Sequence, residues 1–257
     1  MRYSVPAIML IPVWLATWRK LKTAPLWSVI AMLGWGAPFL WLVTASVKDT
    51  KVVYLATIVP CTMPIFAVVV ERVLFKKQPG RTQLFGFALI AIAAVLVVLN
   101  ALFGGGISLS SLALMLLAAC GWGSYVVSFR HTGLTAAQGA AWVCVASTAL
   151  IVTIKLVFGD ELMPLTTEQF VFNAIAQGLL SGFVAVLLYT IAIEKLGPAQ
   201  AASYGVLVPA LASFFAWVWL GETPTLFNLI ALTFGTAGVA IINGLVPVHL
   251  MPARLRN

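Results

Sequence analysis

The sequence has few charged residues, and acids are the scarcest of them. Only 9% of its 257 residues are Asp, Glu, Lys or Arg, whereas 62% are hydrophobic. A soluble domain carries roughly 25% charged residues, so this chain lacks the polar surface that keeps a protein in water. The net charge of +8 comes from basic residues that lie between hydrophobic runs rather than in one patch. This distribution argues against a nucleic-acid partner.

The chain is also poor in the side chains that build catalytic and metal sites. Cys61, Cys120 and Cys144 lie far apart inside apolar segments, and no CxxC or Cys/His spacing indicates a metal or a disulfide. His131 and His249 fall at the edges of apolar segments. None of the seven acids lies at the centre of a segment, and no Walker motif is present. We therefore predict no catalytic residue, no metal, no cofactor and no direct use of ATP.

The sequence does contain a succession of long apolar runs. About 18–20 such residues cross the hydrocarbon core of a bilayer. Because a backbone in lipid must satisfy its own hydrogen bonds, runs this apolar predict helices rather than barrel strands. The sequence thus predicts an all-α integral membrane protein with about nine transmembrane helices, at residues 4–18, 27–46, 52–72, 83–102, 110–129, 134–158, 171–193, 199–219 and 226–246.

The basic residues fall unequally on the two sides of these predicted helices. When the loops are numbered alternately, one side holds Arg19, Lys20, Lys22, Arg72, Lys76, Lys77, Arg81, Arg130, Lys195, Arg254 and Arg256. The other side holds Arg2, Lys48, Lys51 and Lys155. Basic loops stay in the cytoplasm. We expect a multi-pass protein of the bacterial inner (plasma) membrane with a cytoplasmic C-terminus.

A shift of 145 residues relates the two parts of the chain. It places Pro64 on Pro209 and Pro79 on Pro224, and it aligns segment 52–72 with 199–219 and 83–102 with 226–246. Segment 110–129 has no counterpart, so the first part has four helices and the second five. Because an odd number of crossings reverses the next copy, the halves are expected to be inverted. Secondary transporters commonly have this architecture.

Several short motifs resemble one family of membrane proteins. They are Ser203 to Leu211, Trp219-Leu-Gly-Glu222, Val59-Pro-Cys-Thr-Met-Pro64, Gln83-Leu-Phe-Gly86 and Gly121-Trp-Gly123. Together they are similar to the EamA-like branch of the drug/metabolite transporter superfamily, along essentially the whole chain. The resemblance implies a parent of ten helices, of which the opening one is missing here. It departs from the family at Lys77, where the first half often has an acid.

The expected organisation follows from the repeat and the resemblance. Residues 1–103 form the first, incomplete EamA-like repeat, residues 107–247 the second, and residues 248–257 a basic cytoplasmic tail. Whether the missing helix reflects a truncation or the native protein stays open.

A transport pathway needs aromatic or polar groups at mid-depth, where they are costly in lipid. Trp35 lies beside Gly36 and before Pro38, and Trp122 and Tyr125 lie near the middle of their segment. The resemblance places further helices around the central cavity. The predicted pathway residues are Trp35, Thr57, Trp122, Tyr125, Tyr189, Ser203 and Tyr204. Packing against neighbouring helices is the alternative role for each of them.

Three prolines inside predicted helices are candidate hinges. Pro60, Pro64 and Pro209 each remove a backbone donor and clash with the preceding turn, which bends a helix. Static kinks that fit the packing are the alternative.

These features favour a secondary transporter that exports or exchanges small metabolites, such as amino acids, by alternating access. The expected partners are a small-molecule substrate and the lipid bilayer, and a homodimer is compatible with the sequence. Two alternatives stay open, of which the stronger is a non-transporting membrane partner or truncated fragment. The other is a membrane-embedded enzyme, which would want His, acids or Ser grouped at one interface.

Overall fold

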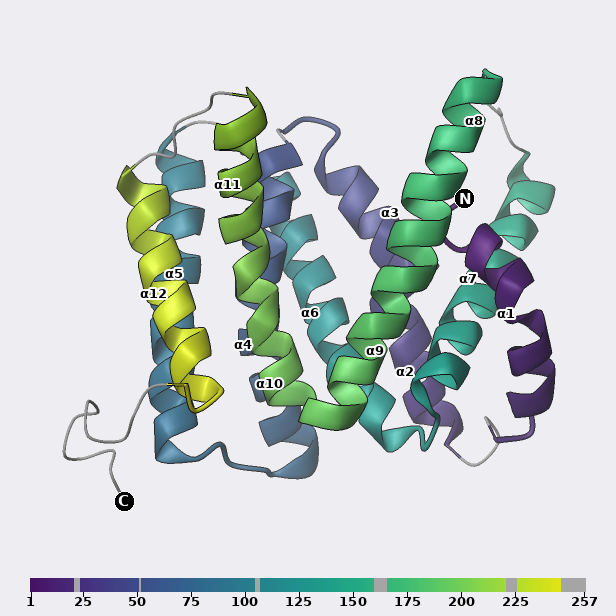
Figure 1. The fold of residues 1–257 in the computed structure, drawn as a ribbon, viewed down its shortest axis with the longest axis horizontal. Helices are drawn as coiled ribbons and strands as arrows, with labels where there is room; N and C mark the ends of the chain where they lie inside the picture. The colour runs from purple at the N-terminus through teal and green to yellow at the C-terminus, as the bar shows by residue number, and fades with distance from the viewer. Residues whose placement is uncertain (21–23, 51, 105–106, 160–165, 221–225, 246–257) are drawn as a thin grey trace. The chain divides into compact units, whose positions relative to one another are not determined.

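The computed structural model describes residues 1–20, 24–50, 52–104, 107–159, 166–220 and 226–245, and within these ranges it contains helices and no strand (Figure 1). Glu222 and the predicted tail 248–257 lie outside the described residues. The elements in chain order are α1 (Ser4–Thr17), α2 (Pro25–Trp35), α3 (Ala37–Ser46), α4 (Val52–Phe75), α5 (Arg81–Phe103), α6 (Leu109–His131), α7 (Ala136–Phe158), α8 (Thr167–Asn173), the π-helix η2 (Ala174–Val184), α9 (Ala185–Leu196), α10 (Pro198–Ser203), the 3-10 turn η3 (Tyr204–Val206), α11 (Leu207–Leu220) and α12 (Leu226–Ile242).

Six helical stretches of the described chain are long and apolar enough to cross a membrane. They are Pro25–Ser46, Tyr54–Phe75, Arg81–Phe103, Leu109–His131, Ala136–Phe158 and Thr167–Leu196, and shorter apolar helices run over Ser4–Thr17 and Leu229–Ile242. Large apolar side chains such as Phe103, Leu156 and Phe158 are more than four-fifths exposed. Lipid is the environment that such surfaces require. The protein is a multi-pass α-helical membrane protein.

The helices form two compact units. Unit 1 comprises residues 1–40 and 125–197, and unit 2 comprises residues 41–124 and 198–257. Neither unit coincides with one predicted repeat, because each combines segments from the first half of the chain with segments from the second.

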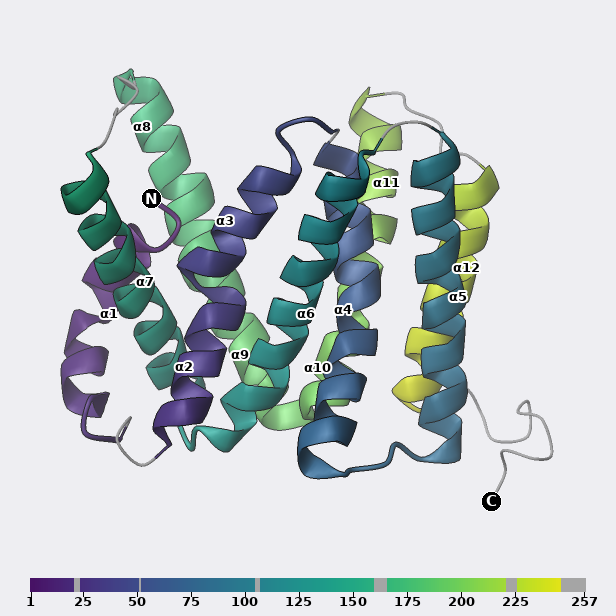
Figure 2. The same cartoon turned by 180° about the vertical axis from the view of Figure 1, so that it is seen from behind.

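In unit 1, α1 packs on α7 and on η2, and α7 also contacts α2 and α9 (Figure 2). Two glycines of η2 let α1 approach closely. A Cβ atom added at Gly178 would lie 2.7 Å from Cβ of Val5, and one at Gly182 would collide with the carbonyl oxygen of Arg2. Glycines four residues apart allow this kind of close helix contact in membranes.

In unit 2, α5 and α12 lie side by side in both views (Figures 1 and 2). The two helices are antiparallel, since Gly86 faces Gly238 and Ile242, whereas Ala93 further along α5 faces Gly235. We call Gly86, Gly235 and Gly238 the glycine seam.

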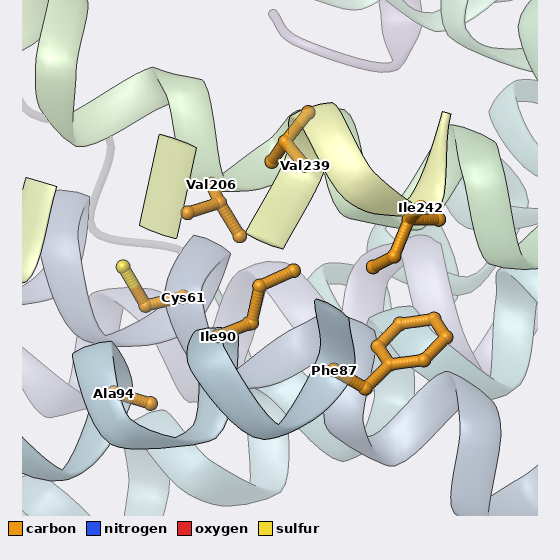
Figure 3. Close-up of a cluster of buried hydrophobic side chains, with 7 residues drawn as sticks. All are labelled: Cys61, Phe87, Ile90, Ala94, Val206, Val239 and Ile242. Atoms are coloured by element: carbon orange, nitrogen blue, oxygen red, sulfur yellow. The ribbon is translucent and has the colours of Figure 1, made fainter. Parts of the chain in front are cut away.

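An apolar cluster fills the space beside the glycine seam. Phe87, Ile90 and Ala94 of α5 meet Cys61 of α4, Val206 of η3, and Val239 and Ile242 of α12 (Figure 3). Cys61 is a free, buried cysteine that packs here as a small apolar residue.

The segment predicted as one helix at 27–46 is interrupted, so that prediction is wrong in its centre. Trp35 ends α2, Gly36 has an extended backbone with φ −88° and ψ −151°, and Ala37 begins α3. Pro38 explains the break, because it cannot donate a hydrogen bond to the Gly34 carbonyl within a continuous helix, whereas proline suits the first turn of a new helix. The two pieces together still form a single candidate span.

The segment predicted at 199–219 also changes geometry. It runs as α10, tightens into a 3-10 turn at Tyr204–Val206, and continues as α11. Pro209 cannot donate a hydrogen bond to the carbonyl of Gly205, which lies in that turn. In contrast, α4 runs without interruption through Pro60 and Pro64. The hinge role of all three prolines stays a prediction.

Candidate functional site

The candidate site of unit 1 centres on Trp35 at the end of α2. Its ring stacks on Phe39 with centroids 5.0 Å apart, on Tyr125 at 5.6 Å and on Tyr189 at 6.1 Å. The interplanar angles of these three pairs are 24°, 20° and 26°. Only 7% of Trp35 is exposed and Tyr125 is fully buried. We call Trp35, Phe39, Tyr125 and Tyr189 the aromatic cluster.

The break between α2 and α3 holds Trp35 in position. Hydrogen bonds from other helices satisfy the polar backbone there, as a bilayer requires. The Tyr3 hydroxyl donates to the carbonyls of Trp35 at 2.7 Å and of Gly36 at 3.0 Å. The Ala37 amide donates to Oγ of Ser147 at 3.0 Å. A Cβ atom at Gly36 would collide with that same Oγ, so the contact requires glycine at this position.

A second hydrogen bond holds Tyr125. Its hydroxyl lies 2.8 Å from Oγ1 of Thr190, and that Oγ1 donates to the Val186 carbonyl at 2.6 Å. Because a threonine hydroxyl has one hydrogen, Tyr125 must be the donor to Thr190. Both side chains are fully buried. The hydroxyl therefore orients the ring of Tyr125 within the aromatic cluster.

A cation completes the cluster. The guanidinium carbon of Arg2 lies 5.7 Å from the centroid of the Trp35 ring, within the range of a cation–π contact. Such a contact is worth about 2 kcal/mol when desolvated. The cluster thus offers flat apolar faces together with one positive charge.

The structure brings together three predicted pathway residues, Trp35, Tyr125 and Tyr189, in unit 1. The other four lie in unit 2, where Thr57 and Trp122 are partly buried and Tyr204 is 38% exposed. Ser203 is fully buried, donates to the Gln200 carbonyl at 2.7 Å and accepts from Nδ2 of Asn243 at 3.0 Å. Both of these bonds lie within unit 2.

Sequence reasoning missed several members of the site, namely Arg2 and Tyr3, Phe39, Ser147 and Thr190. Arg2 and Tyr3 lie at the start of an apolar run. The charge of Arg2 indicated only the orientation of the chain in the membrane, not a binding site. Ser147 and Thr190 are single hydroxyl residues in otherwise apolar segments. Serine and threonine often bond to their own helix, so sequence alone did not separate these two from the rest.

Two further contacts lie near helix ends, outside the aromatic cluster. Nζ of Lys77 lies 2.8 Å from Oε1 of Glu71. His131 packs on Trp27 with ring centroids 5.5 Å apart. Among the residues that the structure describes, no three His, Cys, Asp or Glu side chains lie close enough to hold a metal ion.

Comparisons with known proteins find related sequences. A model of the EamA-like transporter family matches residues 109–244. The "probable terminal-alkyne amino-acid exporter" of Streptantibioticus cattleyicolor is 28% identical over 196 residues, which cover 73% of this chain. The chain spans 63% of the length of that relative. The "uncharacterized transporter YdfC" of Bacillus subtilis is 26% identical over 227 residues, which cover 85% of this chain and 71% of that protein.

The fold also matches a solved structure. A crystal structure aligns with a TM-score of 0.65 and 19% identity, covering 95% of this chain and 85% of the other. This match supports the helical architecture and says nothing of the substrate.

Proposed function

Because the chain belongs to the EamA-like transporter family, we propose that it is a secondary carrier that exports or exchanges small metabolites, with amino acids as the substrate class. Family membership carries the assignment to transport, and the relatives are named as transporters rather than enzymes. The substrate class rests on the relative that is named as an amino-acid exporter.

The aromatic cluster is our proposed wall of the transport pathway. Binding sites for small molecules combine apolar and aromatic surfaces with a few placed polar groups. Trp35, Tyr125 and Tyr189 supply such surfaces from α2, α6 and α9, and Arg2 supplies a charge. Thr57, Trp122, Ser203 and Tyr204 stay proposed as pathway residues on unit 2. Pro60, Pro64 and Pro209 stay proposed as hinges.

Two inverted halves are our proposal for the architecture, with about nine membrane helices. Helices that the shift of 145 residues pairs also pack together, namely α5 with α12 and α4 with α11. The antiparallel course of α5 and α12 is the orientation that inverted copies require. Alternating access would then use the two compact units as the moving parts. We further propose that the C-terminus lies in the cytoplasm of a bacterial cell.

Counterflow in proteoliposomes tests the proposed function. Purified protein would be reconstituted with unlabelled L-propargylglycine, a terminal-alkyne amino acid, and uptake of the labelled compound would be measured beside a panel of common amino acids. Trp35→Leu is expected to lower the counterflow rate about 3-fold to 10-fold, because a lost aromatic contact is worth about 0.5–1.5 kcal/mol. Trp41→Leu is the matched control, since Trp41 is 66% exposed on the same span.

Saturable counterflow that Trp35→Leu reduces and Trp41→Leu preserves would support the carrier and its pathway. Equal flux in the two variants would move the pathway away from Trp35, and Trp122→Leu would test unit 2 next. Absence of flux for the whole panel in folded protein would favour the non-transporting alternative.

A further inference from the structure

A cavity in unit 1 combines positive charge with unused hydrogen-bonding groups. Its volume is about 240 Å³. Its lining includes the basic Arg2 and Lys155, the hydroxyls of Ser4 and Thr148, and the apolar Ile151. The described residues contribute no carboxylate to this lining. The charge of this lining therefore favours an anionic ligand.

Two buried polar atoms of the lining point to the same conclusion. Nε of Arg2 and Oγ1 of Thr148 are both inaccessible, and neither has a hydrogen-bond partner among the described residues. Leaving a buried donor without a partner is costly, more so when it is charged. Such groups in a membrane protein commonly mark a ligand site.

The position of Arg2 is fixed on two sides. Its carbonyl oxygen lies against Gly182 of η2, and its guanidinium lies over Trp35. A guanidinium held in this way can present its planar fork to a carboxylate with little loss of side-chain freedom. The π-helix that carries Gly182 supports the assignment, because π-helical segments are frequent at functional sites.

We propose that this cavity binds the carboxylate of a small transported substrate. Arg2 donates to the carboxylate, Thr148 adds a hydroxyl donor, and Lys155 contributes a longer-range attraction. The inference rests on the proposed function and specifies its substrate class as small carboxylates. The cavity volume lies below the ~300–1,000 Å³ of pockets for drug-sized ligands, which favours a compact molecule. An anionic lipid headgroup offers similar oxyanion chemistry, but Trp35 connects Arg2 with the buried aromatic cluster rather than with lipid.

Measuring how small carboxylates bind to the purified protein tests this site separately from transport. The probes are L-propargylglycine and its carboxamide, which share a side chain and an amine and differ at the carboxylate. Acetate and inorganic phosphate extend the panel. Nanodiscs of phosphatidylcholine, with and without phosphatidylglycerol, measure any competition by anionic lipid.

We expect the carboxamide to bind about 10-fold to 100-fold more weakly than the amino acid, as for loss of a charged hydrogen bond. Arg2→Gln should weaken binding of the amino acid by a similar factor and leave the carboxamide unchanged. Arg2→Lys keeps the charge and should restore part of the affinity. Thr148→Val, which is nearly isosteric, should weaken binding about 3-fold to 10-fold.

Arg19→Gln is the matched control. The Arg19 guanidinium lies 5.8 Å from the ring of Trp18, so it makes a similar cation–π contact, but it is exposed and does not line the cavity. The Arg19→Gln variant should bind all probes with the same affinity as the unsubstituted protein.

Equal binding of amino acid and carboxamide, or equal effects of Arg2→Gln and Arg19→Gln, would overturn the site. So would Arg2-dependent binding of phosphatidylglycerol alone, because it would assign the cavity to lipid. Carboxylate binding that depends on Arg2 in a protein without counterflow would support the site and contradict the proposed function. Counterflow that proceeds equally well with the amino acid and with its carboxamide would support the proposed function and contradict the site.

Discussion

Among the described residues, side-chain hydrogen bonds between helices are more frequent in unit 1 than in unit 2, while glycines let helices approach closely in both units. In unit 1, side chains bond across helices, as Tyr3 bonds to Trp35, Ser147 to Ala37, and Trp142 to the Ser28 carbonyl at 2.7 Å. In unit 2, the glycine seam lets α5 and α12 touch along their backbones, and the apolar cluster fills the space beside it.

The lipid environment explains why helices associate both through hydrogen bonds and through close packing. Lipid tails are as apolar as leucine, so helices in a bilayer gain little from hiding apolar surface and associate through close packing or hydrogen bonds instead. Close packing leaves no room for a ligand, whereas a polar interior provides groups that a ligand can use. This difference agrees with the carboxylate site that we propose in unit 1.

Adding one methyl group to the glycine seam should have the largest effect. A Cβ atom at Gly238 would lie 2.6 Å from the carbonyl oxygen of Gly86, which is backbone and cannot rotate away. Gly238→Ala should therefore lower the free energy of unfolding by about 1–3 kcal/mol. Unfolding in detergent, followed by circular dichroism, would measure this loss, and hydrogen exchange would locate it in α5 and α12.

Gly80→Ala provides the control, since a Cβ atom there would meet nothing within 4 Å. Its effect should stay within about 0.5 kcal/mol. If hydrogen exchange instead showed equal loss of protection in α1 and α7, the two units would not be independent in stability.

The helices themselves were largely predictable from sequence. The runs at 83–102, 110–129 and 134–158 correspond to α5 at Arg81–Phe103, α6 at Leu109–His131 and α7 at Ala136–Phe158. Length and apolarity decide these elements, because a bilayer leaves the backbone few alternatives. The break at Gly36 was missed, since two helices joined without a polar loop give one uninterrupted apolar run.

The candidate site was only partly predictable. The pairing of Trp35 with Tyr125 and Tyr189 joins residues far apart in the chain. Mid-segment position suggested Trp35 and Tyr125, and the family resemblance suggested Tyr189, but neither could separate these residues from Trp122, which lies in the other unit. The π-helix at Ala174–Val184 was not predicted either, because its apolar pattern resembles that of an α-helix.

Removing one hydrogen bond between helices of unit 1 should lower the free energy of unfolding less than Gly238→Ala in the glycine seam does. Ser147→Ala leaves the amide of Ala37 without its acceptor inside the protein. Hydrogen bonds between membrane helices contribute about 0.6–2 kcal/mol, so we expect a loss of about 1 kcal/mol. The same unfolding assay measures it, with hydrogen exchange reporting faster opening at the start of α3.

Thr153→Ala is the matched control on the same helix. Its hydroxyl is exposed and bonds only to the Ala149 carbonyl one turn back in α7. A change near zero is expected there. If Ser147→Ala were as neutral as Thr153→Ala, hydrogen bonds would not be what stabilises unit 1.

The smallest effect should come from a charge at the edge of unit 1. Oε2 of Glu194 accepts a hydrogen bond of 2.9 Å from the amide of Ala136 at the start of α7, where the helix dipole favours a negative charge. Glu194→Gln keeps an acceptor and removes the charge, so the free energy of unfolding should fall by about 0.3–1 kcal/mol at low ionic strength. Because salt screens charges near the surface, this difference should shrink as salt is added.

Glu168→Gln in the first turn of α8 distinguishes the effect of a charge at a helix N-terminus from the effect of the hydrogen bond between Glu194 and Ala136. Glu168 is exposed and also lies near a helix N-terminus. Equal, salt-sensitive losses in both variants would assign the effect to the dipole alone. A larger loss for Glu194→Gln that survives high salt would show that the bond to Ala136 joins α9 to α7. Hydrogen bonding would then hold unit 1 together at its edge as well as in its interior.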